Sequence, residues 1–96
     1  MLKSFEEMEL QERRAIDFAL YLIANDYGHT IKIPARELER QLKDKGRNIS
    51  FMTIGNYFKT LERMGYAKKK MHCRLWGATY KLNRYAFEKM INEKQG

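Results

Sequence analysis

The sequence predicts one mostly helical α+β domain, made of a three-helix core, a small β-hairpin and an added C-terminal helix. The chain has 96 residues, 44% of them hydrophobic, which allows a modest core but is too small for a separate catalytic domain. Residues 50–64 repeat apolar side chains at helical spacing, and residues 66–82 have the pattern of two strands joined by a basic turn. We therefore assign residues 1–96 to a single domain.

The first helix is expected over about residues 5–25, because Ser4 and Glu7 have the spacing of a capping box. Its second half is apolar on two faces, and one face is enough to pack on the domain. The surplus apolar residues are Leu10, Phe18, Tyr21 and Leu22. A helix with two apolar faces in a small domain usually has two partners. The second partner is either the same helix of another protomer, which would make a homodimer, or the C-terminal helix of the same chain.

A short strand and a second helix are expected next, over about residues 30–33 and 34–45. The strand segment is rich in β-branched residues, and the helix is amphipathic and ends at Gly46. Glu39 and Lys43 have the spacing of a favourable ion pair on this helix.

The third helix is expected over about residues 50–64, since Ser50 is a good N-cap and Gly65 can take the left-handed conformation that ends a helix. One face is apolar: Phe51, Ile54, Phe58 and Leu61. The other face is polar and cationic, with one methionine: Met52, Asn56, Lys59, Thr60 and Arg63. Glu62 is the only acid nearby, whereas a merely solvated face would mix both signs. Such a face suits insertion into a DNA major groove.

The last two elements are a hairpin over about residues 66–82 and a helix over about residues 84–94. Alternation predicts that Tyr80 and Leu82 face inward and Lys81 outward. Asn83 is a good N-cap for the final helix, whose apolar stripe needs the first helix as a partner.

The charge is unevenly distributed along the chain. Residues 1–35 hold four basic residues against six acids, whereas residues 47–84 hold nine basic residues against one acid. This asymmetry favours a polyanion partner, and it favours nucleic acid over a membrane because the basic stretch has strand character. No apolar run reaches the roughly 18 to 20 residues of a membrane span, and no secretory signal is evident. We therefore expect an intracellular protein, cytoplasmic or associated with the nucleoid.

A pattern of apolar, glycine and hydroxyl residues runs from the second helix through the hairpin: Leu38, Leu42, Gly46, Ile49, Ser50, Thr53, Ile54, Phe58, Leu61, Gly65, Tyr66, Tyr80 and Leu82. In this pattern the sequence resembles the winged helix-turn-helix superfamily of DNA-binding domains. With the first helix, the resemblance covers nearly the whole chain, and it is specific to the superfamily rather than to one family within it. It implies that helix 50–64 is a recognition helix and that the hairpin is the wing.

If the recognition helix enters the major groove, the candidates for base contacts are Thr53, Asn56 and Thr60. Asparagine can pair with adenine through two hydrogen bonds, and threonine can donate, accept or offer its methyl group to thymine. The candidates for backbone contacts are Arg47, Ser50, Lys59 and Arg63. Arg36, Arg40 and Lys43 are either further phosphate contacts or solvated surface. An ordinary solvated face remains the alternative for the three base-contact candidates.

The wing is expected to contact phosphates or the adjacent minor groove through Lys68, Lys69, Lys70, Arg74, Trp76 and Lys81. Trp76 either packs under the wing or wedges against sugar and phosphate. So many like charges on one hairpin repel one another unless a polyanion relieves them.

No metal, cofactor or catalytic site is expected. His29, His72 and Cys73 offer three ligands in two distant places, whereas a zinc tetrad needs four. Cys73 is expected to be an unpaired thiol. Because no nucleophile with a base, phosphate-binding glycine loop or catalytic carboxylate pair is evident, we do not expect an enzyme.

The resemblance thus implies a protein that reads double-stranded DNA as a transcriptional regulator. It would bind as a homodimer through the first helix, and with the C-terminal helix as a further contact. Two alternatives stay open: an architectural or chromosomal DNA-binding protein with little sequence preference, and a winged-helix protein-interaction module of a larger assembly. The lysine run weighs against the second alternative, since protein interfaces are depleted in lysine. RNA binding is disfavoured because exposed aromatic pairs for stacking are not evident.

Overall fold

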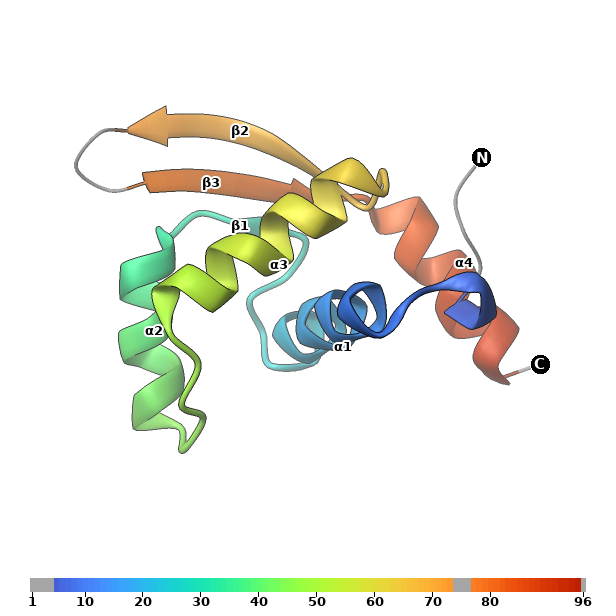
Figure 1. Ribbon diagram of the computed structural model, residues 1–96, viewed down its shortest axis with the longest axis horizontal. Helices are drawn as coiled ribbons and strands as arrows, with labels where there is room; N and C mark the ends of the chain where they lie inside the picture. Colours follow the sequence, from blue (N-terminus) through green and yellow to red (C-terminus); the bar gives the residue numbers. More distant parts are fainter. Residues whose placement is uncertain (1–4, 74–76, 96) are drawn as a thin grey trace.

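A computed structural model describes residues 5–73 and 77–95 of the chain, and the side chains of residues 6–70 and 79–92 (Figure 1). The described elements, in order, are the 3-10 turn η1 (Phe5–Glu7), α1 (Leu10–Ala24), β1 (Thr30–Ile31), α2 (Ala35–Asp44), α3 (Phe51–Arg63), β2 (Ala67–Cys73), β3 (Gly77–Leu82) and α4 (Arg84–Gln95). The expected mostly helical α+β class is confirmed, with four α-helices and a three-stranded antiparallel sheet in the described part.

The elements are arranged around α3, which runs alongside the β2–β3 hairpin (Figure 1). Helix α1 packs on the other side of α3, and α2 packs against α3 near its N-terminal end. Helix α4 lies at the opposite end of the molecule from α2, next to the root of the hairpin (Figure 1). The principal extents are 40 × 27 × 23 Å. The part of α3 that faces neither α1 nor the hairpin is therefore the part left open to solvent.

The sheet has the order β1-β3-β2, so β3 is its central strand. The expected first strand is shorter than predicted, and it pairs Thr30 with Lys81 and Ile31 with Tyr80. The predicted hairpin is formed by β2 and β3, which pair as far as Cys73 and Gly77. The register of β2 shifts by one residue between Lys69 and Met71, which marks a β-bulge at Lys70.

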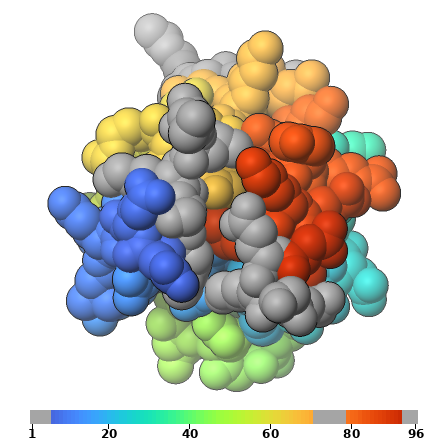
Figure 2. Space-filling model, turned by 90° about the vertical axis from the view of Figure 1, so that its right-hand side faces the viewer, coloured from blue at the N-terminus to red at the C-terminus, as the bar shows by residue number. Residues whose placement is uncertain are grey.

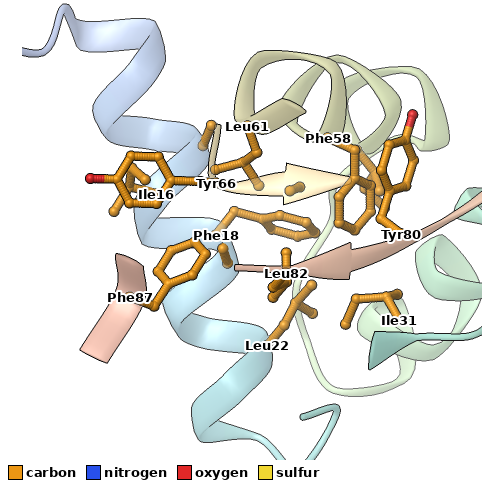
Figure 3. Close-up of a cluster of buried hydrophobic side chains, with 14 of the residues drawn as sticks. Ile16, Phe18, Leu22, Ile31, Phe58, Leu61, Tyr66, Tyr80, Leu82 and Phe87 are labelled. Atoms are coloured by element: carbon orange, nitrogen blue, oxygen red, sulfur yellow. The ribbon is translucent and has the colours of Figure 1, made fainter. Parts of the chain in front are cut away.

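Aromatic side chains hold α1, α3 and β3 together in the core (Figure 3). The Phe58 and Tyr80 rings stack with centroids 4.6 Å apart and planes 7° apart, and the Phe18 ring meets Phe58 edge-on at 5.9 Å. Phe18 also contacts Tyr57 at 5.2 Å, and Tyr66 contacts Phe87 of α4 at 5.2 Å. Such pairs stabilise a core by about 0.5–1.5 kcal/mol each beyond the area that they bury.

Two residues predicted for a dimer interface lie instead in the core of the chain itself. Phe18 is 3% exposed and Leu22 is fully buried, so this part of the prediction is wrong. The second apolar face of α1 is covered within the chain itself. Helix α3 packs on α1, and α4 contributes Phe87 to the same cluster of buried side chains (Figure 3). Leu10, 64% exposed, and the half-buried Tyr21 remain accessible.

Helix α1 was predicted to begin near residue 5, but it begins at Leu10. Ser4 lies outside the described residues, and the acidic residues after it form the 3-10 turn η1. The capping-box spacing is met one turn later, where the backbone N–H of Glu9 donates to Oε1 of Glu12 at 2.9 Å.

The predicted helix ends are confirmed at four positions. Thr53 N–H donates to Ser50 Oγ at 3.2 Å at the start of α3, and Ala86 N–H donates to Asn83 Oδ1 at 3.2 Å at the start of α4. Gly46 and Gly65 end α2 and α3 with φ of 86° and 85°. The backbone N–H of each glycine and that of the residue after it donate the two hydrogen bonds of a Schellman motif.

Helix α1 ends with the longer of these two hydrogen bonds but without glycine. Tyr27 N–H donates to the carbonyl oxygen of Leu22 at 3.1 Å, and Asp26 between them has φ of 69°. A side chain in this left-handed region is strained by contact of its Cβ with the backbone. Asp26 therefore occupies a position that favours glycine.

Replacing Asp26 with glycine is expected to raise the free energy of unfolding by about 0.5 kcal/mol, since relief of strain exceeds the entropy that glycine adds to the unfolded chain. Gly46→Ala is the matched opposite change, because an added Cβ there meets nothing within 4 Å and only backbone strain is introduced. It should lower the free energy of unfolding by about 1 kcal/mol. Urea denaturation followed by circular dichroism measures both; a less stable Asp26→Gly variant would contradict the strain argument.

Candidate nucleic-acid interface

The exposed side of α3 carries a single stripe of side chains, which we call the α3 stripe. Its members recur at helical spacing along the whole helix: Met52, Asn56, Lys59 and Arg63. All four are exposed, Met52 to 67%. The stripe changes from apolar and neutral groups near the start of α3 to cations near its end, and the one acid exposed on α3, Glu62, lies beside it. It therefore offers contacts for an apolar group, a hydrogen-bonding edge and phosphates in that order.

Thr60 is not part of this stripe, although the sequence placed it among the base contacts. It is 6% exposed, so the prediction of a base contact at Thr60 is wrong. Thr60 lies toward the side of α3 that carries Tyr57, where α1 packs through Phe18. The buried arc of the helix is consequently wider than its apolar residues alone indicate.

Thr53 and Ser50 are engaged with each other at the start of α3. The Ser50 hydroxyl donates to Thr53 Oγ1 at 3.0 Å and accepts from the Thr53 backbone N–H. The hydroxyl of Ser50 would have to leave Thr53 before it could donate to a phosphate, and the half-buried Thr53 would have to turn toward a base. The predicted DNA contacts of these two residues stay predictions, and each would require breaking a hydrogen bond between them.

The N-terminus of α3 is also closed by an acid that the sequence had assigned elsewhere. Glu39 of α2 accepts a hydrogen bond from the backbone N–H of Phe51 through Oε1, rather than forming the expected pair with Lys43. A carboxylate at this position is favourable because the helix dipole places positive charge there. It also occupies the site where a phosphate would approach. The cations that can attract phosphate to α3 are thus those further along the helix.

The arginines around α2 are held by neighbouring groups. The Arg36 guanidinium lies 4.4 Å from the centre of the Phe51 ring, and that of Arg47 lies 4.2 Å from the centre of the Tyr21 ring. Arg40 pairs with Glu37 and, at 3.5 Å, with Asp44. These ion pairs raise the pKa of Arg40 and lower that of Glu37, chiefly through the hydrogen bonds between the two. The phosphate contact predicted for Arg47 would have to form while its guanidinium lies on the Tyr21 ring.

A groove of about 350 Å³ runs between α3 and the hairpin. Its lining combines an apolar floor with a polar rim: Ala35, Phe51, Met52, Gly55, Asn56, Phe58, Lys59, Lys69 and Tyr80. Burial, and secondarily the charge of Glu62, raises the pKa of the Tyr80 phenol. Tyr80 therefore stays neutral and adds no negative charge that would repel a phosphate in the groove.

The β2–β3 pairing divides the hairpin lysines between two faces. Lys69 lies opposite Tyr80, which is buried against α3, so Lys69 is on the face turned toward α3 and lines the groove. Lys68 lies opposite Lys81, and both belong to the other face. Lys70 is the bulged residue. All four lysines are exposed, but the structure joins only Lys69 to the α3 stripe, so the predicted wing contacts of Lys68 and Lys81 are not part of a site on that side of the sheet. Arg74 and Trp76 of the predicted wing lie outside the described residues.

Three contributors to this interface were not proposed from the sequence: Met52, Gly55 and Glu39. Met52 was placed on the open face but given no role. Gly55 is a glycine in the interior of a helix, which is itself a signal, because glycine costs about 1 kcal/mol there relative to alanine. No sequence signal distinguishes Glu39 from the other acids of α2, since its role depends on how α2 and α3 pack.

Gly55→Ala separates stability from binding. An added Cβ meets nothing within 4 Å, so the free energy of unfolding should rise by about 1 kcal/mol through the better helix propensity of alanine. Duplex DNA that approaches the helix backbone at the groove should bind less tightly to this variant. Thermal unfolding and fluorescence anisotropy measure the two effects; a stabilised variant with unchanged affinity would show that nothing approaches α3 at Gly55.

Two further properties bear on the kind of site. In the part of the chain that the structure describes, no helix has both the length and the apolar content to cross a membrane. Among the same residues, no group of three or more His, Cys, Asp or Glu side chains could hold a metal ion.

Comparison with family models, curated proteins and solved structures finds no match to this chain.

Proposed function

We propose that the chain is a winged helix-turn-helix protein that binds double-stranded DNA, with α3 as the recognition helix and the β2–β3 hairpin as the wing. The observation that carries this proposal is the α3 stripe, an exposed row of neutral and cationic groups with Lys69 across the adjacent groove. A face exposed only to water would mix acids and bases. A polyanion that follows the helix satisfies all of these cations at once.

In this mode α3 lies in the major groove, which is wide enough for a helix. Asn56, at the middle of the stripe, faces the base edges, and Met52 offers an apolar contact to a thymine methyl group. Lys59, Arg63 and Lys69 bind phosphates on either side of the helix. The hairpin then follows the backbone beside the groove. We expect this mode to serve a transcriptional regulator that occupies operator DNA.

A second candidate is an architectural DNA-binding protein with little sequence preference, and the structure contains a specific reason to keep it. Thr60 is buried and Thr53 is hydrogen-bonded to Ser50. Of the three predicted base contacts, only Asn56 is therefore exposed and free to reach a base. Phosphate contacts position a protein on DNA but carry no sequence information. The two candidates therefore differ in whether Asn56 distinguishes one sequence from another.

The test titrates labelled random-sequence duplex and a selected duplex pool with the protein at several salt concentrations. Lys69→Ala should weaken binding to both pools and reduce the slope of log affinity against log salt by about one. Asn56→Ala should retain binding to the random pool but lose about 1–3 kcal/mol of preference for the selected pool. Both changes are surface truncations, so the thermal unfolding midpoint should stay unchanged.

Lys89→Ala and Asn92→Ala are the matched controls, because they remove the same groups from exposed positions of α4 and should leave both titrations unaltered. Equal, tight binding of both pools by the wild type would establish the architectural candidate. Absence of binding to any duplex at about 50 mM salt would refute DNA binding and favour a protein-interaction module.

The proposed homodimer interface now contains fewer of the residues that were predicted for it. Phe18 and Leu22 are buried in the chain, which leaves Leu10 and the half-buried Tyr21 of the predicted interface. In a dimer, the two α3 helices would meet successive major grooves about 34 Å apart, and the preferred site would be a pseudo-palindrome.

Leu10→Glu is expected to convert the dimer to a monomer, because it places a charge in an apolar contact between protomers. Gln11→Glu adds the same charge at the next exposed position and serves as the control. Sedimentation velocity at the concentrations used for DNA binding reports the mass. A monomeric wild type would refute the dimer, as would a Leu10→Glu variant that sediments like the wild type.

A further inference from the structure

The hairpin has a second basic face that the α3 stripe does not use. Thr30, Lys81 and Lys68 form a row across the three strands, on the side of the sheet turned away from α3. All three are exposed, whereas their neighbours Ile31, Tyr80 and Leu82 are buried. Lys68 and Lys81 lie directly opposite each other, an arrangement that destabilises a sheet because like charges repel.

These residues border a hollow of about 690 Å³ at the root of the hairpin. Its lining is His29, Thr30, Gly65, Ala67, Lys68, Lys81, Leu82, Asn83, Arg84 and Tyr85. The lining holds three lysine or arginine side chains and no acid. The Nε of Arg84 donates to Oε1 of Glu88 at 2.9 Å, one turn further along α4, so only Arg84 of the three has an acid beside it. In Figure 2 the orange strands, the red helix α4 and cyan atoms near β1 gather on the right-hand side of this end.

The chemistry of the hollow fits an extended polyanion better than a small anion or a lipid surface. Its two lysines are exposed, so neither is a buried cation that could enclose a single phosphate. The row extends across three strands, which suits phosphates spaced along a nucleic-acid backbone. Tyr85 is 73% exposed and is the one large side chain at the rim that presents an aromatic face for packing against a sugar or base.

A duplex seated on α3 leaves this surface free. Successive residues of a strand point to opposite faces, so Lys69 faces the α3 groove while Lys68 and Lys81 face the other way. The hollow also lies at the hairpin root, beside the start of α4, whereas the α3 groove reaches Ala35 at the start of α2. The two basic surfaces therefore lie on opposite faces of one sheet.

We propose that the surface formed by Lys68, Lys81, Arg84 and Tyr85 binds the backbone of a second DNA duplex, so that one molecule holds two duplexes. This inference rests on the proposed binding of a first duplex to the α3 stripe. It assigns the like-charge pair a function, because phosphates between Lys68 and Lys81 relieve the repulsion that the free sheet contains.

The test immobilises a duplex, saturates it with protein and measures capture of a second, fluorescent duplex of unrelated sequence. Lys68→Ala/Lys81→Ala should bind the first duplex within about twofold of the wild type, yet capture about tenfold less of the second, since two of its phosphate contacts are lost. Lys45→Ala/Lys89→Ala removes the same charge from exposed positions at the end of α2 and in α4 and should capture like the wild type. The first double variant should unfold at or above the wild-type temperature because repulsion is removed.

Three outcomes would overturn the inference while leaving the proposed function intact. One is a wild type that binds the first duplex but captures no second. Another is undiminished capture by Lys68→Ala/Lys81→Ala, which would place bridging in a dimer with two α3 helices. The third is an equal loss of first-duplex and second-duplex binding, which would make the two surfaces one. Failure of the wild type to bind even the first duplex would refute the proposed function itself.

Discussion

The stacked pair of Phe58 and Tyr80 is the interaction on which the rest of the structure depends. It joins the buried face of α3 to the inner face of the central strand β3 at 4.6 Å, and Phe18 of α1 closes it edge-on. Once these rings are buried, helical periodicity turns the α3 stripe outward, and strand alternation turns Lys81 to the far side of the sheet. The placement of both basic surfaces is thus a consequence of one aromatic cluster.

The fold class and the helix ends could be predicted from sequence because they depend on local chemistry. Ser50 and Asn83 each cap a helix by accepting from the backbone N–H three residues further on, and Gly65 acts through its own backbone angle. Each occupies its predicted position. The predicted start of α1 was wrong because two successive pairs of residues have the capping-box spacing, and the later pair is the one that forms it. Sequence offers no energetic measure that ranks Ser4 with Glu7 above Glu9 with Glu12.

The candidate site could be predicted only in part, since burial depends on packing between elements. Thr60 and Phe18 have side chains suited to their predicted roles, but the contact between α1 and α3 removes both from solvent. The hydrogen bond between Glu39 and the start of α3 could not be predicted for the same reason, because its partner is 12 residues away on another helix. Asn56, Lys59 and Arg63 were placed correctly on the open face because they lie opposite the apolar residues, where every packing of the helix leaves them exposed.

The position of β2 in the sheet gives its lysines a consequence independent of any ligand. With the order β1-β3-β2, no strand of the described part of the chain pairs with one side of β2, so this edge can pair with an edge from another molecule. Lys68, Lys69, Lys70 and the bulge at this edge are features that discourage such addition. Charge on this strand therefore keeps the protein from self-association into aggregates. Neutralising that charge with a bound polyanion would remove the safeguard along the surface where molecules are brought together.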